Sequence, residues 1–122
     1  MTSILIADDD FISLEVLKAM LSSYNVNIIT AQDGKQACQL ALEHRPSLII
    51  LDYEMPVMTG AEACANLRKN SQFKNIPIIA LTGHQSSTEL NTCRDAGMNQ
   101  TLHKPVSPEA IAELFKSYLP NI

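Results

Sequence analysis

The stretch SLIILDYEMPVMTG, from Ser47 to Gly60, decides the fold, because an apolar run ends there on a single aspartate. Four apolar residues, LIIL, lead directly into Asp52, and the chain then enters a loop that contains Pro56. A run this short and rich in isoleucine, followed by turn residues, is typical of a strand buried on both faces of a parallel sheet. Asp52 is therefore predicted at the carboxyl end of a core strand.

Similar short apolar runs recur along the chain, with helical patterns between them. The predicted strands are Ser3 to Ala7, Val26 to Ala31, Ser47 to Leu51, Ile76 to Leu81 and Gln100 to His103. Strict alternation of strand and helix predicts an α/β fold, with a single doubly wound five-stranded parallel sheet flanked by five helices and right-handed crossovers. Ligands of such sheets bind beyond the carboxyl ends of the strands.

The segments between the strands repeat their apolar residues about every 3.6 positions, as amphipathic helices do. The stripe of the first helix is Phe11, Leu14, Leu17, Leu21 and Tyr24; the second helix is predicted over Asp33 to His44, and the third over Gly60 to Lys69. The last begins at the N-cap Ser107, with Pro108 at its first position.

The fourth helix shows the weakest apolar pattern. Ser86 and Glu89, three residues apart, are typical of a capping box, and Gly97 is a candidate left-handed C-cap. The apolar side of this helix holds only Leu90, Cys93 and Ala96. We therefore expect it to be the most weakly held helix.

Composition limits the function classes. The 122 residues predict one domain, 1–122, and a net charge of −4 argues against direct nucleic-acid binding. The apolar runs are too short to span a membrane and the N-terminus lacks a secretory signal pattern, so a cytoplasmic protein without membrane contact is expected. The three cysteines, Cys38, Cys64 and Cys93, lack the spacing of a zinc site and are expected to be small core residues.

Polar residues follow the predicted strands where each one ends. Asp8, Asp9 and Asp10 follow the first, Asp52 the third, Thr82 the fourth and Lys104 the fifth. Any one of these residues alone would be explained as a helix cap, a turn former or a solvated side chain. Together they converge on one edge, because parallel strands end on the same side of a sheet.

Crowding Asp8, Asp9 and Asp52 costs repulsion and desolvation, which a bound divalent cation would offset. Oxygen ligands favour Mg²⁺ or Mn²⁺. With the cation in place, one carboxylate can attack phosphorus while Lys104 and Thr82 stabilise the transferring oxygens. The chemistry suggested is formation of an aspartyl phosphate.

The motifs DDD, LDYEMPVMTG, ALTG and GMNQTLHKP, in this order and spacing, resemble the receiver domains of two-component response regulators over essentially the whole chain. The resemblance implies a flavodoxin-like fold with strand order 2-1-3-4-5. It implies that Asp52 is the phosphoacceptor, that Asp9 ligates the metal directly and that Asp8 often acts through water. The Glu54 backbone carbonyl would complete the metal shell.

The resemblance also assigns roles at the ends of the fourth and fifth strands. Thr82 would be the switch hydroxyl, and Gly83 would leave room for the phosphoryl group. Lys104 would pair with that group, and Pro105 commonly follows the lysine through a cis bond.

Two departures from the family pattern stand out. Thr101 occupies the position of the usual switch aromatic, so no ring can swing inward beside Thr82; an ordinary strand residue is the simpler interpretation. The other departure is His103, and with it His84. His84 would line the approach of water to the phosphoryl group and, with Glu54, set the phosphate lifetime, although a solvated loop histidine is nearly as good an explanation. His44 is expected to be a helix-dipole partner.

The predicted function is transfer of a phosphoryl group from a phosphohistidine to Asp52, a step that a receiver catalyses for itself, as it does dephosphorylation. The signal would be passed on by a conformational shift of the face formed by the fourth helix, fifth strand and fifth helix. Expected partners are a histidine kinase or a histidine phosphotransfer domain, since IPIIALTGH and GMNQTLHKP look most like the receivers of hybrid histidine kinases. Such receivers are often monomeric, so a monomer is expected.

Two alternatives belong to other classes. A haloacid dehalogenase-like phosphatase also uses an aspartate, a lysine and Mg²⁺, but it expects its nucleophile on the first strand and a DxDx[TV] signature. A pseudo-receiver that only binds partners is disfavoured because the acidic residues, Thr82 and Lys104 are all present.

Overall fold

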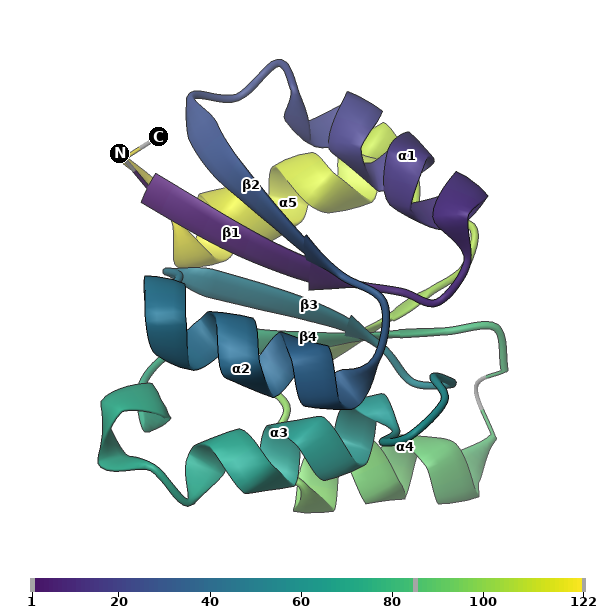
Figure 1. The fold of residues 1–122 in the computed structure, drawn as a ribbon. Coiled ribbons are helices and arrows are strands. Elements are labelled where there is room, and N and C mark those ends of the chain that lie inside the picture. The colour runs from purple at the N-terminus through teal and green to yellow at the C-terminus, as the bar shows by residue number, and fades with distance from the viewer. Residues whose placement is uncertain (1, 85, 122) are drawn as a thin grey trace.

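The computed structural model describes residues 2–84 and 86–121, which form one five-stranded sheet covered by helices on both faces (Figure 1). The strands are β1 (Thr2–Ala7), β2 (Val26–Ala31), β3 (Leu48–Asp52), β4 (Ile78–Thr82) and β5 (Gln100–His103). All pairings are parallel, and the order is β2-β1-β3-β4-β5. This confirms the predicted fold class and strand order.

The helices are α1 (Phe11–Leu21), α2 (Gly34–His44), α3 (Gly60–Arg68), α4 (Ser87–Asp95) and α5 (Pro108–Tyr118). A short 3₁₀ helix, Ser71–Phe73, follows α3. Among the residues that the structure describes, no helix is long and apolar enough to cross a membrane.

Successive residues of the inner strands point to opposite faces and so build two cores. Ile4 and Ile6 of β1 pack with the buried residues of α1 and α5, whereas Leu5 and Ala7 pack with those of α2 and α3. Every residue of β3 is buried. The carboxyl end of β3 is therefore held in place by a rigid strand that is buried on both faces.

Two local predictions need correction. Phe11 belongs to the helical stripe by spacing, yet 66% of its surface is exposed, because α1 begins beyond the end of β1 and its first residue has no strand beneath it. The fourth strand begins at Ile78 and not at Ile76, since Pro77 has no N–H for the ladder.

All five α-helices begin with a polar N-cap side chain that accepts a backbone N–H. Ser107 caps α5, with Pro108 next, as predicted. At α3, Thr59 and Glu62 form a complete capping box. At α4, Ser86 accepts from the N–H of Glu89, but the Glu89 carboxylate bonds elsewhere, so among the described contacts only half of the predicted box forms.

Helix α4 has little apolar anchorage, as predicted. Of its nine residues, all of them described, only Cys93 is buried, and Leu90 is 37% exposed. The other four α-helices each bury at least three residues. The chain leaves α4 at Gly97, whose φ of 98° lies in the left-handed region after the C-cap Ala96.

The first strand and the last helix of the chain have their outer ends at the same side of the molecule. Strand β1 starts, and helix α5 finishes, at the amino edge of the sheet, opposite the edge on which the strands end (Figure 1).

Candidate active site at the carboxyl edge of the sheet

Sheet register brings the polar strand ends together. Ala7 pairs with Leu51, which puts Asp8 level with Asp52, and Asp52 itself pairs with Leu81 of β4. Thr82 pairs with His103, so Lys104 lies one residue beyond. Together with loop residues they line a cavity of about 580 Å³: Asp8, Asp9, Asp10, Asp52, Glu54, Met55, Pro56, Thr59, Gly83, His84 and Lys104.

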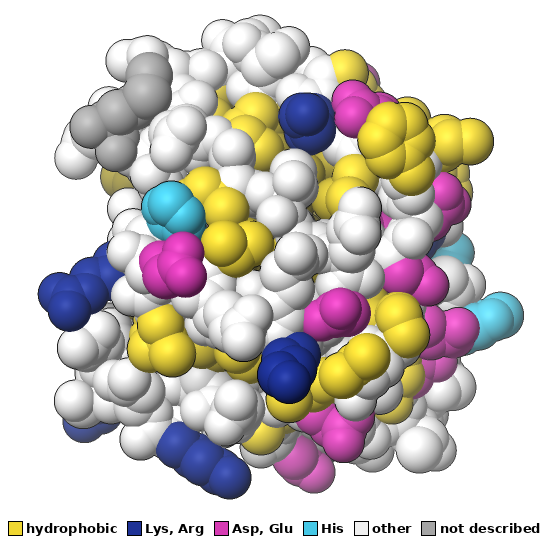
Figure 2. All heavy atoms as spheres, in the orientation of Figure 1, with side chains coloured by type: hydrophobic (Ala, Val, Ile, Leu, Met, Phe, Trp, Pro, Cys, Tyr) yellow, Lys and Arg dark blue, Asp and Glu magenta, His cyan; other side chains and the backbone are white. Residues whose placement is uncertain are grey.

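Three carboxylates cluster in this cavity. One oxygen each of Asp8, Asp9 and Asp52 lies within 4.8 Å of the others. Asp8 is fully buried and Asp52 is 5% exposed, whereas Asp9 is exposed at the rim. Figure 2 shows acidic side chains gathered at this edge of the molecule. Two buried carboxylates and one at the surface form a donor set open to solvent on one side.

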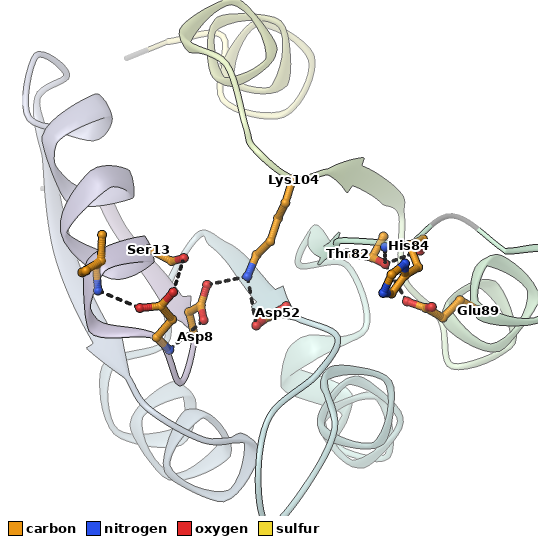
Figure 3. Close-up of polar contacts among 9 residues, drawn as sticks. Asp8, Ser13, Asp52, Thr82, His84, Glu89 and Lys104 are labelled. Atoms are coloured by element: carbon orange, nitrogen blue, oxygen red, sulfur yellow. Dashed lines mark hydrogen bonds and ion pairs between the residues drawn. The ribbon is translucent and has the colours of Figure 1, made fainter.

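Lys104 bridges the two buried carboxylates (Figure 3). Its Nζ donates to Asp8 Oδ2 at 2.9 Å and lies 3.1 Å from Asp52 Oδ2. A single ammonium between two carboxylates leaves one negative charge without a local cation. The donor set therefore fits a hard divalent cation, which prefers clustered carboxylate oxygens and water.

The environment of Asp52 favours its protonated form. Burial is the largest cause and the charge of Asp8 adds to it, so that the pKa of Asp52 rises to about 7 although Lys104 opposes the shift. Burial lowers the pKa of Lys104, but its hydrogen bonds to Asp8 and Asp52 outweigh that effect and raise the pKa overall. Lys104 thus stays charged while Asp52 is sensitive to added positive charge.

The Thr82 hydroxyl is turned away from this cluster. Although Thr82 is only 2% exposed, its Oγ1 lies 2.5 Å from Glu89 Oε1 and accepts from the His84 N–H at 3.0 Å. It also contacts the His84 carbonyl. In Figure 3, Thr82, His84 and Glu89 form a group separate from Asp8, Asp52 and Lys104.

Sequence reasoning did not find the contact between Glu89 and Thr82. The signal available was the spacing of Ser86 and Glu89, which predicts a helix cap and gives no sign that the carboxylate reaches β4.

The loop after β3 is held tightly against the strand that carries Asp52. The Gly60 N–H donates to the Tyr53 carbonyl at 3.0 Å, and a Cβ at Gly60 would lie 2.4 Å from the Asp52 carbonyl oxygen. Between them, the Met58 N–H donates to the Pro56 carbonyl at 2.7 Å around Val57, whose φ is 71°. This is a γ-turn, a strained conformation for a β-branched residue.

Gly83 contrasts with Gly60. It lines the cavity, and a Cβ there would meet no described heavy atom within 4 Å. There is therefore open space beside Gly83.

The remaining predicted residues have simpler surroundings. His84, His103 and His44 are all exposed, and of the three His84 lines the cavity. Thr101 is a half-buried residue of β5, consistent with a strand role. The bond between Lys104 and Pro105 is cis, as the resemblance implied. Cys38, Cys64 and Cys93 are buried, and burial raises the pKa of each thiol.

Known proteins share this sequence pattern and fold. The family described as response regulator receiver domain matches residues 4–116. The polar-differentiation response regulator DivK of Brucella anthropi is 29% identical over 117 residues, which cover 96% of this chain and 95% of DivK.

Two solved structures superpose closely. The chemotaxis protein CheY4 of Vibrio cholerae has a TM-score of 0.91 at 32% identity, with 98% of this chain and 99% of that chain covered. The receiver domain of the sensor histidine kinase PA1611 of Pseudomonas aeruginosa, described with magnesium coordinated in its active-site cleft, has a TM-score of 0.91 at 29% identity, with 98% of both chains covered. The chain therefore belongs to the response regulator receiver domain family of two-component signalling.

Proposed function

We propose that this chain accepts a phosphoryl group from a phosphohistidine onto a carboxylate oxygen of Asp52. Phosphorylation of an aspartate is typical of the family to which the chain belongs. The observation that carries the proposal for this residue is its position: Asp52 ends the fully buried β3, opens into the cavity and lies 3.1 Å from Lys104 Nζ. A carboxylate held on a core strand is an oriented nucleophile.

In this step a bond forms between an Asp52 oxygen and phosphorus, and the phosphorus–nitrogen bond of the donor breaks. The electron pair stays on the imidazole nitrogen, which takes up a proton from solvent as it leaves. Lys104 is placed to pair with the phosphoryl oxygens, and open space beside Gly83 leaves room for them. Thr82 would join them after its hydroxyl rotates.

Mg²⁺, or Mn²⁺, is the proposed cofactor. Asp8, Asp9 and Asp52 would hold it with the backbone carbonyl of Glu54, which lines the same cavity. When bound, the cation supplies positive charge that favours ionised Asp52 and neutralises phosphoryl oxygens. Support comes from the clustered carboxylates here and from the magnesium described in the PA1611 receiver.

The proposed partners are a histidine kinase or a histidine phosphotransfer domain. The phosphoryl group would either be passed on to a phosphotransfer histidine or change the surface formed by α4, β5 and α5. The likeness to the receiver of a sensor histidine kinase supports the first route, and the shallow packing of α4 supports the second. The proposed location is the cytoplasm, where such donors act. The haloacid dehalogenase alternative gains no support from the family match.

Mass spectrometry with acetyl phosphate and Mg²⁺ tests the proposal. The wild type should gain one base-labile phosphoryl group, and Asp52→Asn should gain none. Lys116→Met, an exposed α5 variant, should be labelled like the wild type and so controls for unspecific effects. A folded wild type that stays unlabelled would contradict the proposal and favour a partner-binding pseudo-receiver.

A further inference from the structure

The Thr82 hydroxyl is engaged on the side facing α4. Its Oγ1 lies 2.5 Å from Glu89 Oε1, also contacts the His84 carbonyl oxygen, and accepts from the His84 N–H at 3.0 Å. A hydroxyl has one proton to donate, and among its acceptors here the Glu89 carboxylate is the charged one. The Thr82 proton is thus directed toward α4 and away from Asp52.

We propose that Glu89 is a positioning residue that competes with the Asp52 phosphoryl group for the proton of Thr82. The inference rests on the proposed function, because the competitor is the phosphoryl group on Asp52. Thr82 cannot donate to both acceptors, so the two bonds exclude each other. Glu89 therefore sets how readily Thr82 turns toward the site.

A comparison within the chain shows that the Glu89 contact is not ordinary helix capping. Helices α3 and α4 begin with the same pattern, Thr59 with Glu62 and Ser86 with Glu89. The Glu62 carboxylate accepts from the Thr59 N–H at 2.9 Å and completes its capping box. The Glu89 carboxylate instead reaches Thr82 on β4. Glu62 therefore caps its own helix, whereas Glu89 connects α4 to Thr82 at the end of β4.

The contact matters for α4 because so little else holds that helix. Of its nine residues, all described, only Cys93 is buried, so the hydrogen bond from Glu89 to β4 attaches the first turn, where no α4 residue is buried. Rotation of Thr82 toward a phosphoryl group would break this bond and free the start of α4. Phosphorylation and α4 mobility are then linked through one side chain.

Binding of beryllofluoride with Mg²⁺, a stable stand-in for the phosphoryl group, tests the competition. Glu89→Ala should bind it on the order of tenfold more tightly than the wild type, as expected when a hydrogen bond to a charged group no longer has to be broken. Glu62→Ala should bind like the wild type, although it loses a carboxylate at the same helix position. Glu89→Gln, which keeps the size of the side chain, should lie between wild type and Glu89→Ala.

A double-mutant cycle separates positioning from simple charge repulsion. If Glu89 acts through Thr82, Glu89→Ala should not change beryllofluoride affinity in a Thr82→Ala background; an equal gain there would overturn the inference in favour of repulsion. Without any phosphate mimic, Glu89→Ala should shift the Thr82 methyl resonance and Glu62→Ala should not. A wild type that binds beryllofluoride, with Glu89→Ala indistinguishable from it, overturns this inference alone; a wild type that is neither labelled nor bound overturns the proposed function and the inference with it.

Discussion

Lys104 Nζ lies 3.1 Å from Asp52 Oδ2, so the proposed phosphoacceptor is already paired with a cationic side chain. The same ammonium donates to the fully buried Asp8 at 2.9 Å. Lys104 is therefore as important for tolerating the buried carboxylates as for the chemistry proposed at Asp52.

Lys104→Met should lower the free energy of unfolding by about 3 kcal/mol in EDTA, because it leaves two buried carboxylates without their cation. Mg²⁺ should restore part of this loss. Urea denaturation measures both effects. Lys116→Met, which removes an exposed ammonium from α5, should change stability by less than about 0.5 kcal/mol. Equal stabilities of the two variants would contradict the role given to Lys104.

The raised pKa of Asp52 predicts how stability depends on pH in EDTA. Its pKa is about 7 in the folded protein, against about 3.9 in an unfolded chain. Between these values the folded state keeps a proton that the unfolded state has lost. The contribution of Asp52 to stability is therefore present below about pH 4 and lost as pH rises toward 7, by at most about 1.4 kcal/mol per pH unit.

Asp52→Asn should remove this contribution, so that the variant is more stable than the wild type near pH 7 and the difference shrinks toward pH 4. Chemical denaturation across this range measures it. A constant difference between the two proteins would show that Asp52 does not titrate there.

Variants at Asp9 and Asp10 should distinguish metal binding from helix capping. Asp9 is exposed and belongs to the carboxylate cluster, so Asp9→Ala should leave stability in EDTA nearly unchanged and abolish most of the rise in melting temperature caused by Mg²⁺. Asp10 caps α1 by accepting from the Ile12 N–H at 3.0 Å, so Asp10→Ala should cost about 1 kcal/mol and keep the Mg²⁺ response. Thermal melts with and without Mg²⁺ measure both; the opposite pattern would place the cation elsewhere.

The two glycines near the site should respond differently to a methyl group. Gly60→Ala would press a Cβ to 2.4 Å from the Asp52 carbonyl oxygen, and should destabilise the fold by about 1–3 kcal/mol and slow phosphorylation by displacing β3. Gly83→Ala has free space and should keep its stability. Urea denaturation and the rate of acetyl phosphate labelling test this, and a harmless Gly60→Ala would mean that the loop can move away from Asp52.

Backbone placement of the site was predictable because it depends on strand ends. Short apolar runs identified all five strands, and parallel strands end on a common edge, so Asp8, Asp52 and Lys104 could be brought together from their positions after these runs. The roles of these residues depended on the family resemblance, which the match over residues 4–116 confirms for the chain as a whole.

Side-chain direction was not predictable in the same way. Thr82 ends β4 as expected, yet its hydroxyl faces Glu89, and only the placement of α4 decides which acceptor it meets. The capping pattern of Ser86 and Glu89 was misleading because two donors, the Ser86 N–H and the Thr82 hydroxyl, can compete for one carboxylate, and the hydroxyl holds it here. Phe11 likewise follows the periodicity of α1 but extends past the sheet, where spacing carries no information about burial.

The positions of the first strand and the last helix have a consequence for covalent fusion to other domains. Because β1 starts and α5 finishes at the amino edge, any neighbouring domain joined at either terminus would attach at the opposite side of the sheet from the cavity, about 17–20 Å away for strands of this length. Such a neighbour could be added without covering the entrance to the site. A kinase or phosphotransfer histidine could thus approach one side while a tether holds the other.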